Sequence, residues 1–342
     1  AGIVTATGGI TNNGITIANT AAVNYALSLS SDANISDVSF NALDLTATIN
    51  FQGIEPGGLT PNQGNVAGAL NTIFGGGTTL PFMPALLQIP TQGQLTAALS
   101  QLAPSGDGAT HGAAMQTGAT FAGQLLSCRT IGEGDANAII REGQCLWARG
   151  TIRHATFDHG GESYGATETA PFVSAGAQFN LGGPWRMGGG IGYETSHLDT
   201  NSGSTTDSDR LHLGGVLKYN PGPLLLAATV TGAFGWSDSE RHVNIADFSA
   251  SASSNYDTDF ISGRLTAAYL LPFRGMYLKP QVDVAYSHVS RDGYTEHGTG
   301  GIALVVASSD DGVWSARPML EIGTEVHLAG GGVARPYLKG GV

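Results

Sequence analysis

The chain has 342 residues, of which 51 are glycine and 12% are charged, and its formal net charge is −12. So few charged helix formers cannot coat the surface of a soluble helical protein, which excludes an architecture of long exposed helices. Nucleic acid is excluded as a partner, because duplex binding needs clustered lysine and arginine that release counterions, and the sequence has no such cluster.

Residues 1–52 are rich in threonine, serine, asparagine, valine and isoleucine, arranged in short alternating runs. This pattern favours the last coils of a β-solenoid. An irregular β-rich tail is the alternative, because no repeat period can be fixed over so short a stretch. The start AGIVTATGG has neither a methionine nor an apolar signal core, so we expect an export signal upstream of it.

Residues 53–144 differ in character, with apolar residues at helical spacing that glycine and proline repeatedly interrupt. This predicts a linker of short helical pieces. Within it, residues 109–126 contain no proline and many small side chains, which predicts one slender helix of about 27 Å at 1.5 Å per residue. Such a helix fits a narrow pore. Its representative positions are Ala109, Met115, Thr117, Thr120 and Gln124.

From Cys145 onward, within residues 145–342, the hydrophobic period becomes two, which is typical of strands. Between Leu224 and Trp236, every even position is apolar or glycine. The longest apolar stretch, PGPLLLAATVTGAFGW, is shorter than the roughly 20 residues of a membrane-spanning helix, so any membrane role must use strands. We predict nine strands, near residues 145–157, 170–180, 185–198, 209–220, 223–237, 257–272, 276–290, 312–328 and 332–342.

The opposite face of these strands carries charged residues. A charge facing lipid costs about 2–4 kcal/mol at the membrane midplane, so we expect these side chains to face a lumen. Their function there is contact with the helix and a passing chain, or simple solvation of the lumen. The candidates are Arg149, Arg153, Arg186, Glu194, Lys218, Arg264, Lys279, Asp283, Arg317 and Glu321.

The connections alternate in length, because NLGGP, NPGP, PFRG and AGGG are tight turns, whereas the segments between them are long and polar. Short turns on one side and long loops on the other are typical of an antiparallel transmembrane β-barrel. A soluble β-sandwich is the alternative, but its solvent face would not collect an apolar stripe. Aromatic residues near the strand ends would form the interfacial belts: Trp185, Tyr219, Trp236, Tyr277, Tyr286 and Trp314.

Three segments precede or begin the alternating strands in a fixed order: LTPNQGNVAGALNTIFGGGTTLP, then LTAALSQLAPSGDGATHGAAMQTGATFAGQLL, then LWARGTIRHATFD. In this order they resemble the C-terminal translocator of monomeric autotransporters of type V secretion, over almost everything after Asn50. The resemblance implies a twelve-stranded barrel with residues 109–126 as its pore helix. The family's barrel ends on an aromatic residue, whereas this chain shows about nine strands and stops at Val342, so we expect a C-terminally truncated barrel.

Cys128 and Cys145 flank a short segment between the expected helix and the first strand, at the periplasmic end of such a barrel. The periplasm is oxidising, so we expect a disulfide worth roughly 3 kcal/mol by chain-entropy arguments; free thiols or a metal role are the alternatives. We expect no metal, no cofactor and no catalytic site, because the histidines lack metal-ligand spacing and no nucleophile motif occurs. Residues 109–126 contain no asparagine, so we also expect no self-cleavage of the kind that the resemblance associates with some members.

The sequence therefore predicts an outer-membrane translocator, and not an enzyme, that exports its own N-terminal passenger to the surface of a Gram-negative bacterium. Its expected partners are outer-membrane lipid, the barrel-assembly machinery, periplasmic chaperones and its own passenger chain in the pore. The alternatives are an outer-membrane porin or adhesin barrel with an unrelated N-terminal extension, and a secreted β-rich binding protein.

Overall fold

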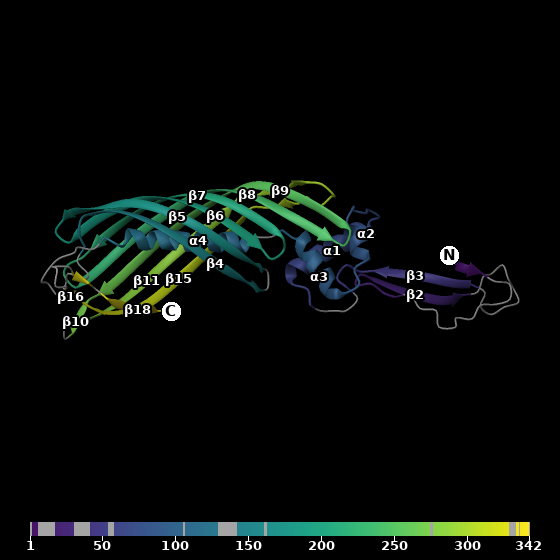
Figure 1. Ribbon diagram of the computed structural model, residues 1–342, viewed down its shortest axis with the longest axis horizontal. Helices are drawn as coiled ribbons and strands as arrows, with labels where there is room; N and C mark the ends of the chain where they lie inside the picture. The colour runs from purple at the N-terminus through teal and green to yellow at the C-terminus, as the bar shows by residue number, and fades with distance from the viewer. Residues whose placement is uncertain are drawn as a thin grey trace.

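The structure is a computed structural model, and it describes residues 2–5, 18–30, 42–53, 58–104, 107–128, 142–160, 163–273, 276–327, 333–334 and 336–341. Its largest element is a curled sheet with a helix inside the curl. A helical unit lies beyond one end of this sheet, and a small sheet with the N-terminus lies beyond that unit (Figure 1). Among the described residues, no helix combines the length and the hydropathy needed to cross a membrane.

The curled sheet is antiparallel and follows the order β4-β5-β6-β7-β8-β9-β11-β15-β18, which makes it a half-barrel bordered by β4 and β18. Its strands are β4 (Cys145–Gly160), β5 (Ser163–Gly182), β6 (Trp185–Thr200), β7 (Ser204–Tyr219), β8 (Leu224–Ile245), β9 (Phe248–Tyr269), β11 (Met276–Arg291), β15 (Ser309–Thr324) and β18 (Tyr337–Gly341). The nine predicted strands and the antiparallel class are confirmed. Short strands at the margins are β10 (Leu271–Phe273), β12 (Tyr294–Thr295), β13 (His297–Gly298), β14 (Val305–Val306), β16 (Val326–His327) and β17 (Val333–Ala334).

The long polar connections predicted from the sequence are mostly strand. The segment expected to link β8 and β9 as a loop instead continues the ladder as far as the pair Ile245 and Phe248, where a two-residue turn reverses the chain. Ala246 in this turn has a φ of 51°, in the left-handed region. The prediction was wrong because the strands continue beyond the apolar band. There both faces of the strands carry polar side chains such as serine, threonine and asparagine, so the hydrophobic alternation that identifies a strand is lost.

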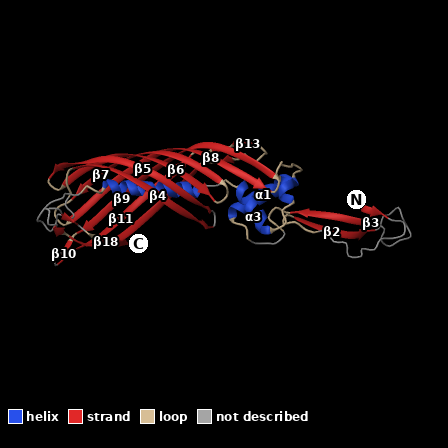
Figure 2. Ribbon diagram, viewed as in Figure 1, coloured by secondary structure: helices blue, strands red, loops and turns tan. Residues whose placement is uncertain are grey.

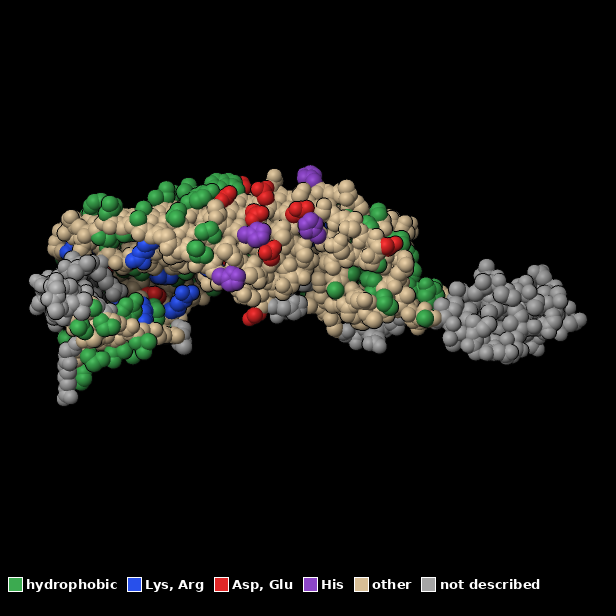
Figure 3. Space-filling model, viewed as in Figure 1, with side chains coloured by type: hydrophobic (Ala, Val, Ile, Leu, Met, Phe, Trp, Pro, Cys, Tyr) green, Lys and Arg blue, Asp and Glu red, His purple; other side chains and the backbone are tan. Residues whose placement is uncertain are grey.

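The outer face of the half-barrel is apolar over part of its length. Val230 and Leu265 are 59% and 63% exposed although neighbouring strands pair with them on both sides. Hydrophobic side chains gather on this part of the surface, whereas acidic and histidine side chains begin farther along the same face, toward the helical unit (Figure 3). From Leu226 to Trp236 the apolar stripe spans ten steps of β8, or about 23 Å of height at a 45° tilt, which matches the apolar band of an outer-membrane barrel.

The helix inside the curl is α4 (Asp107–Leu125), which confirms the helix expected over residues 109–126 (Figure 2). It packs against six strands of the half-barrel, from β5 to β11. Small residues permit this fit: a Cβ added at Gly118 would overlap the ring of Phe260, so the helix and the wall approach each other closely at this point. The lumen is therefore filled by α4.

Residues 58–104 form a compact unit of three helices, α1 (Pro61–Gly75), α2 (Met83–Leu87) and α3 (Gln92–Leu102), where the sequence predicted a linker of short helical pieces. Thr60 and Gln63 cap α1 reciprocally, and Thr91 caps α3. The helices share a core with the tip of the β8–β9 hairpin, which contributes Val243 and Ile245. The prolines that suggested a linker lie at the ends and turns of these short helices, whereas Gly64 and Gly68 lie within α1.

The N-terminal sheet contains β1 (Gly2–Thr5), β2 (Val23–Ser30) and β3 (Ala42–Ile49), with both neighbours of β3 antiparallel. A β-solenoid stacks parallel coils, so the described strands form an antiparallel hairpin with one added strand instead of the solenoid coils that the sequence suggested. Ala21 donates its backbone N–H to Ile89 of the helical unit at 2.8 Å, and Phe51 donates to Asn71 at 2.9 Å, which joins this sheet to the helices.

Candidate functional site: the lumen and its helix

The lumen brings α4 against side chains from most strands of the half-barrel. Gln124 of α4 accepts a hydrogen bond from the Ser174 hydroxyl at 2.5 Å, and both side chains are buried. Phe121 packs edge-on against Phe172, with ring centroids 5.9 Å apart, and against His212 of β7 at the same separation. The C-terminal half of α4 is therefore held against the wall by aromatic packing and by hydrogen bonding.

The five representative positions of the helix divide into two groups. Ala109, Thr117 and Gln124 are buried against the wall, and Met115 is partly buried beside Phe260. Thr120 is exposed and donates to a carbonyl oxygen within its own helix, because it lies on the face of α4 that the half-barrel does not cover.

Two arginines and two glutamates form a quartet on the lumen wall, in which Glu168, Glu194 and Arg210 are buried and Arg153 is partly buried. Arg153 binds both carboxylate oxygens of Glu168, and Arg210 pairs with Glu194. The two pairs are linked, since Arg210 lies 3.9 Å from Glu168 and Arg153 lies 3.8 Å from Glu194. Arg153 also donates to the Thr117 hydroxyl of α4 at 2.8 Å, so the quartet touches the helix directly.

A second set of charges lines the wall on β9, β11 and β15. Lys279 and Glu321 face each other across the β11–β15 ladder at 2.6 Å, and Tyr277 donates its hydroxyl to Glu321 at 2.9 Å. Arg264 lies 4.0 Å from Asp283 and donates to the Ala119 carbonyl oxygen of α4.

The remaining predicted lumen residues lie on the expected face with different surroundings. Arg149 and Arg317 share the inward register of their strands but are exposed: Arg149 lies on the border strand β4, and Arg317 lies on β15 beyond the residues that pair with the five-residue strand β18. Arg186 is half-buried and binds three backbone carbonyl oxygens, one of which belongs to Glu142.

The end of the lumen nearest the tight turns contains the two cysteines. Cys128, three residues after α4, forms a disulfide with Cys145 at the start of β4, and their Cα atoms are 5.9 Å apart. Beside this bridge, Glu142 pairs with Lys218 at 2.6 Å, and neither side chain is exposed. Gln178 donates to Glu142 at 3.1 Å and to the Gly143 carbonyl oxygen at 2.8 Å.

Five of the six aromatic side chains predicted for the interfacial belts lie on the outer face. Trp185 packs against Tyr219 and Tyr286 packs against Trp314, with tilted rings whose centroids are 4.8 and 4.9 Å apart, and Trp236 is half exposed. Tyr277, which the sequence placed in the belt, is buried in the lumen beside Glu321. Tyr277 and Lys279 are two residues apart on the same strand, so their side chains lie on the same face, and both point inward.

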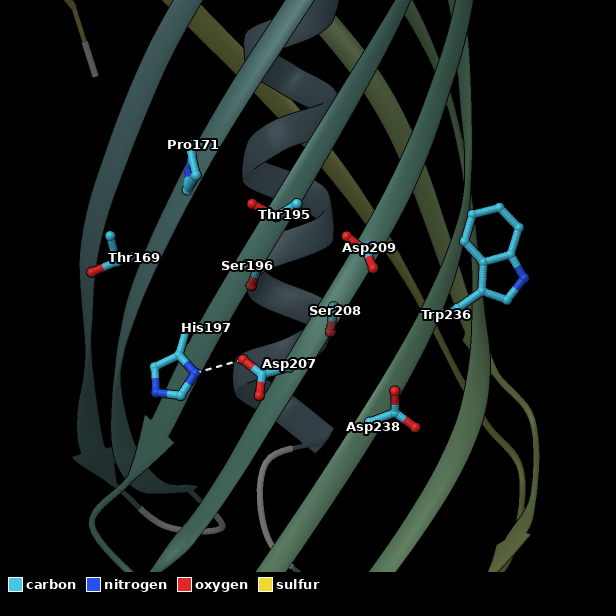
Figure 4. Close-up of a pocket in the computed structure, with 10 residues that line it drawn as sticks. All are labelled: Thr169, Pro171, Thr195, Ser196, His197, Asp207, Ser208, Asp209, Trp236 and Asp238. Atoms are coloured by element: carbon cyan, nitrogen blue, oxygen red, sulfur yellow. Dashed lines mark hydrogen bonds and ion pairs between the residues drawn. The ribbon is translucent and has the colours of Figure 1, made fainter.

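Outside the apolar band, outward-facing side chains of β5 to β8 form a shallow acidic groove of about 370 Å³, shown in Figure 4. The ring of His197 points at Asp207, with 2.6 Å between Nδ1 and the carboxylate oxygen. This hydrogen bond raises the pKa of His197; slight burial opposes the shift, and the charges of Asp207 and Asp199 add to it. Across the described residues, no cluster of histidine, cysteine and acidic side chains has a metal-binding arrangement.

Several residues of the lumen were not predicted from the sequence. Arg210 lies opposite Glu194 in the β6–β7 register, and extending the predicted strand pairing would have found it. Glu168 lies just before the start predicted for its strand, and the period of two would have reached it if the strand had begun earlier. Glu142 has no such signal, since it precedes the first strand and one glutamate in a linker carries no pattern.

Comparison with known proteins places this geometry in a family. The Autotransporter beta-domain family matches residues 146–342, which is more than half of the chain. Among solved structures, the translocator domain of autotransporter NalP from Neisseria meningitidis has a TM-score of 0.54 and 14% identity over 68% of this chain and 76% of that chain. The beta domain of the Bordetella autotransporter BrkA has a TM-score of 0.46 and 20% identity over 58% of this chain and 78% of that chain. The search of curated proteins found no match.

Proposed function

The chain belongs to the autotransporter family through its β-domain, and from this premise we propose that its half-barrel, with α4 inside, carries the strands of residues 1–52 to the cell surface. The β-domain is an outer-membrane translocator for a passenger, and it is a transport domain without catalysis of its own. For the chain as a whole we expect no enzymatic step.

One observation carries the proposal: α4 connects the two ends of the lumen. Its first turns pack beside Ala166 and Leu198, in the part of β5 and β6 that extends beyond the apolar band. Its last turn packs beside Trp147 and Val216, close to the turns at the other end. The chain before α4 therefore leaves the lumen on the side of the extended hairpins, where the helical unit and the N-terminal sheet lie.

The same course of the chain supports the proposed division into domains. Residues 1–52 are the end of the passenger, residues 53–144 are the junction that contains the pore helix, and residues 145–342 are the β-domain. We propose that the barrel-assembly machinery and periplasmic chaperones bring the strands to the membrane, because an unpaired strand edge in lipid is costly and must be closed during insertion.

The helical unit supports an exported position for the junction, because it is bound to the hairpin beyond the apolar band. Arg241 of β8 is buried, pairs with Glu296 and donates to the Gln101 carbonyl oxygen of α3 at 2.8 Å. The Gln101 side chain accepts from the Asn244 backbone at 2.6 Å. A porin with an unrelated extension would not need these contacts between the extension and the outer hairpin.

Protease treatment of intact cells tests the proposal. We expect residues 1–52 to be cleaved on intact cells while the β-domain is protected by the membrane. Protection of residues 1–52 until the outer membrane is permeabilised would contradict export and support a porin with a periplasmic extension.

The variant Arg241→Met tests whether the helical unit is docked on the hairpin. Removing one partner of a buried pair typically costs about 3–5 kcal/mol, so we expect the unit to detach and cleavage between α3 and α4 to accelerate on intact cells. His242→Ala, at the exposed neighbouring position of β8, is the matched control and should be cleaved at the wild-type rate. Equal cleavage of both variants would show that Arg241 does not hold the unit.

A further inference from the structure

Four threonine hydroxyls on the lumen wall have no hydrogen-bond partner in the part of the chain that the structure describes. All four side chains are buried, and they belong to β8 and β9. Other inward hydroxyls are paired, since Ser174 donates to Gln124 of α4 and Ser262 donates to a carbonyl oxygen of β11. A buried hydroxyl without a partner costs free energy, so these four do not stabilise the lumen while α4 fills it. They are Thr229, Thr231, Thr258 and Thr266.

The four threonines form a line along the inner face of the wall. Thr229 and Thr231 follow each other on the inner face of β8. The other two, on β9, pair with the ends of the same stretch of β8: Thr266 lies opposite Ala227, and Thr258 lies opposite Gly235. The eight steps between these partners span about 27 Å along β8. This stretch carries the apolar stripe on its outer face, so the line of hydroxyls accompanies the crossing of the membrane.

The pore helix does not supply partners for these hydroxyls. An α-helix bonds its backbone N–H and C=O groups internally. Phe121 and Leu125 of α4 pack with Ala227 of β8 in one apolar cluster. The same two side chains approach the Thr231 methyl group around Gly214 of β7, because a Cβ added there would lie 3.0 Å or less from each of the three. The helix therefore covers this part of the line with hydrocarbon.

A chain in transit has the polar groups that the helix keeps to itself. The backbone N–H and C=O groups of an extended chain have no internal partners. Those on one side of the chain recur at every second residue, or about 6.8 Å, which is also the spacing of Thr229 and Thr231 along β8. A hydroxyl both donates and accepts, so it binds either backbone group whatever side chains the passing segment carries.

His212 adds a further unpaired polar group, on β7. Its ring is buried between Phe121 and Phe172, with centroids 5.9 and 5.1 Å away, and neither ring nitrogen has a partner among the described residues. It lies two residues from Gly214, which pairs with Thr231. A neutral imidazole offers one donor and one acceptor, so this ring is also suited to a backbone.

We propose that the four threonines and His212 form a track that binds the backbone of the passenger while it crosses the lumen. This inference rests on the proposed translocator function and names the wall that the passing chain contacts. Neutral hydrogen bonds contribute little net free energy each, so the chain moves readily from one group of the track to the next. When α4 fills the lumen, Phe121 and Leu125 cover the track and end this contact.

The rate of export tests the track in the whole protein. The double variant Thr229→Val, Thr231→Val keeps the shape of both side chains and removes both hydroxyls. Losing two neutral hydrogen bonds to the chain in transit should slow export about tenfold. Export is measured in a pulse-chase as the fraction of residues 1–52 that an external protease cleaves on intact cells. The valine variant should resist urea unfolding at least as well as the wild type, because the two hydroxyls have no partner once α4 is bound.

Thr206→Val is the matched control, because this buried threonine on the inner face of β7 already donates its hydroxyl to Ser239 at 3.1 Å. It should export at the wild-type rate. The double variant Thr229→Ser, Thr231→Ser keeps the hydroxyls and removes the methyl groups, so it should also export at the wild-type rate. If the double valine variant assembles poorly, each single valine variant should still slow export about threefold.

Two results would overturn the track. Export of the valine variants as fast as that of Thr206→Val would show that the hydroxyls do not bind the passing chain. Equally slow export of the serine and valine variants would show that the methyl groups matter instead. In both cases, arrival of residues 1–52 at the surface of wild-type cells leaves the translocator function intact. If these residues never reach the surface of wild-type cells, the proposed function fails and the track fails with it.

Discussion

Replacing Arg153 with methionine tests whether the charged wall holds the pore helix in place. Arg153 binds Glu168 on the neighbouring strand, and it donates to Thr117 and Gln116 of α4. Methionine keeps much of the aliphatic stem of the side chain and removes all of these bonds. The substitution therefore separates the contribution of the charge from that of the packing.

The expected loss in the free energy of unfolding depends on the Glu168 carboxylate, which loses Arg153 as a partner. Glu168 has no exposed side-chain surface, and after the substitution it keeps the Ser196 hydroxyl at 2.7 Å and Arg210 at 3.9 Å. Removing one partner of a buried pair typically costs 3–5 kcal/mol, and these two remaining groups place our expectation at about 3 kcal/mol. Arg153→Lys should be intermediate, because one ammonium cannot bind both a carboxylate and two helix acceptors in a fixed fork.

The assay is urea unfolding of the protein from lipid vesicles, with Arg153→Met, Glu168→Gln and the double variant compared in one cycle. The double variant should recover most of the loss, since it leaves no uncompensated charge at this position. Arg149→Met is the matched control: it lies on the same face of β4 but is exposed, and it should change the free energy of unfolding by less than about 0.5 kcal/mol. Equal losses for Arg153→Met and Arg149→Met would refute the reasoning.

Two further predictions concern the helix and the outer groove. Gly118→Ala should lower the free energy of unfolding by about 1–3 kcal/mol because its Cβ overlaps the Phe260 ring, whereas Gly123→Ala, where a Cβ meets no atom within 4 Å, should not; equal effects in urea unfolding would contradict the close approach. The pKa of His197 is raised above 6.5 by Asp207, so the pair adds stability below pH 6.5 that is lost as the pH rises through the raised pKa. In an NMR titration, Asp207→Asn should lower the pKa of His197, and an unchanged titration would exclude this hydrogen bond.

The period of two was sufficient to predict the strands within the membrane, because lipid requires every outward position to be apolar. Outside the membrane this requirement ends. From Ser237 to Ile245 the outward side chains of β8 are polar, so the sequence looked like a loop although the backbone pairing continues without interruption to the turn. Strand ends in water are set by the turn, here at Ala246, and the hydrophobic pattern does not report it.

The lumen residues were predicted by face but not by partner. Alternation placed Lys218, Lys279 and Glu321 inward, and the structure finds all three buried there. The partners of wall residues depend on register, and the partner of Lys218 depends on the path of a segment without a strand pattern, which the sequence does not determine. Tyr277 was predicted wrongly because its position near a strand end was taken to indicate the aromatic belt. The alternation of its strand, which turns Lys279 inward, already placed Tyr277 in the lumen.

The distribution of the ion pairs bears on how a lumen full of charges lets a chain pass. In the described part of the barrel, Lys279 with Glu321, and Arg210 with Glu194, are pairs between neighbouring wall strands. Their charges are compensated without the helix, so these two pairs present dipoles to a passing chain, whereas Arg149 and Arg317 are exposed on the same inner face. The contact of Lys218 with Glu142 differs, because Glu142 precedes the first strand of the wall. The pairs between wall strands suit transport of many sequences, because a charge that is already compensated attracts no particular chain strongly.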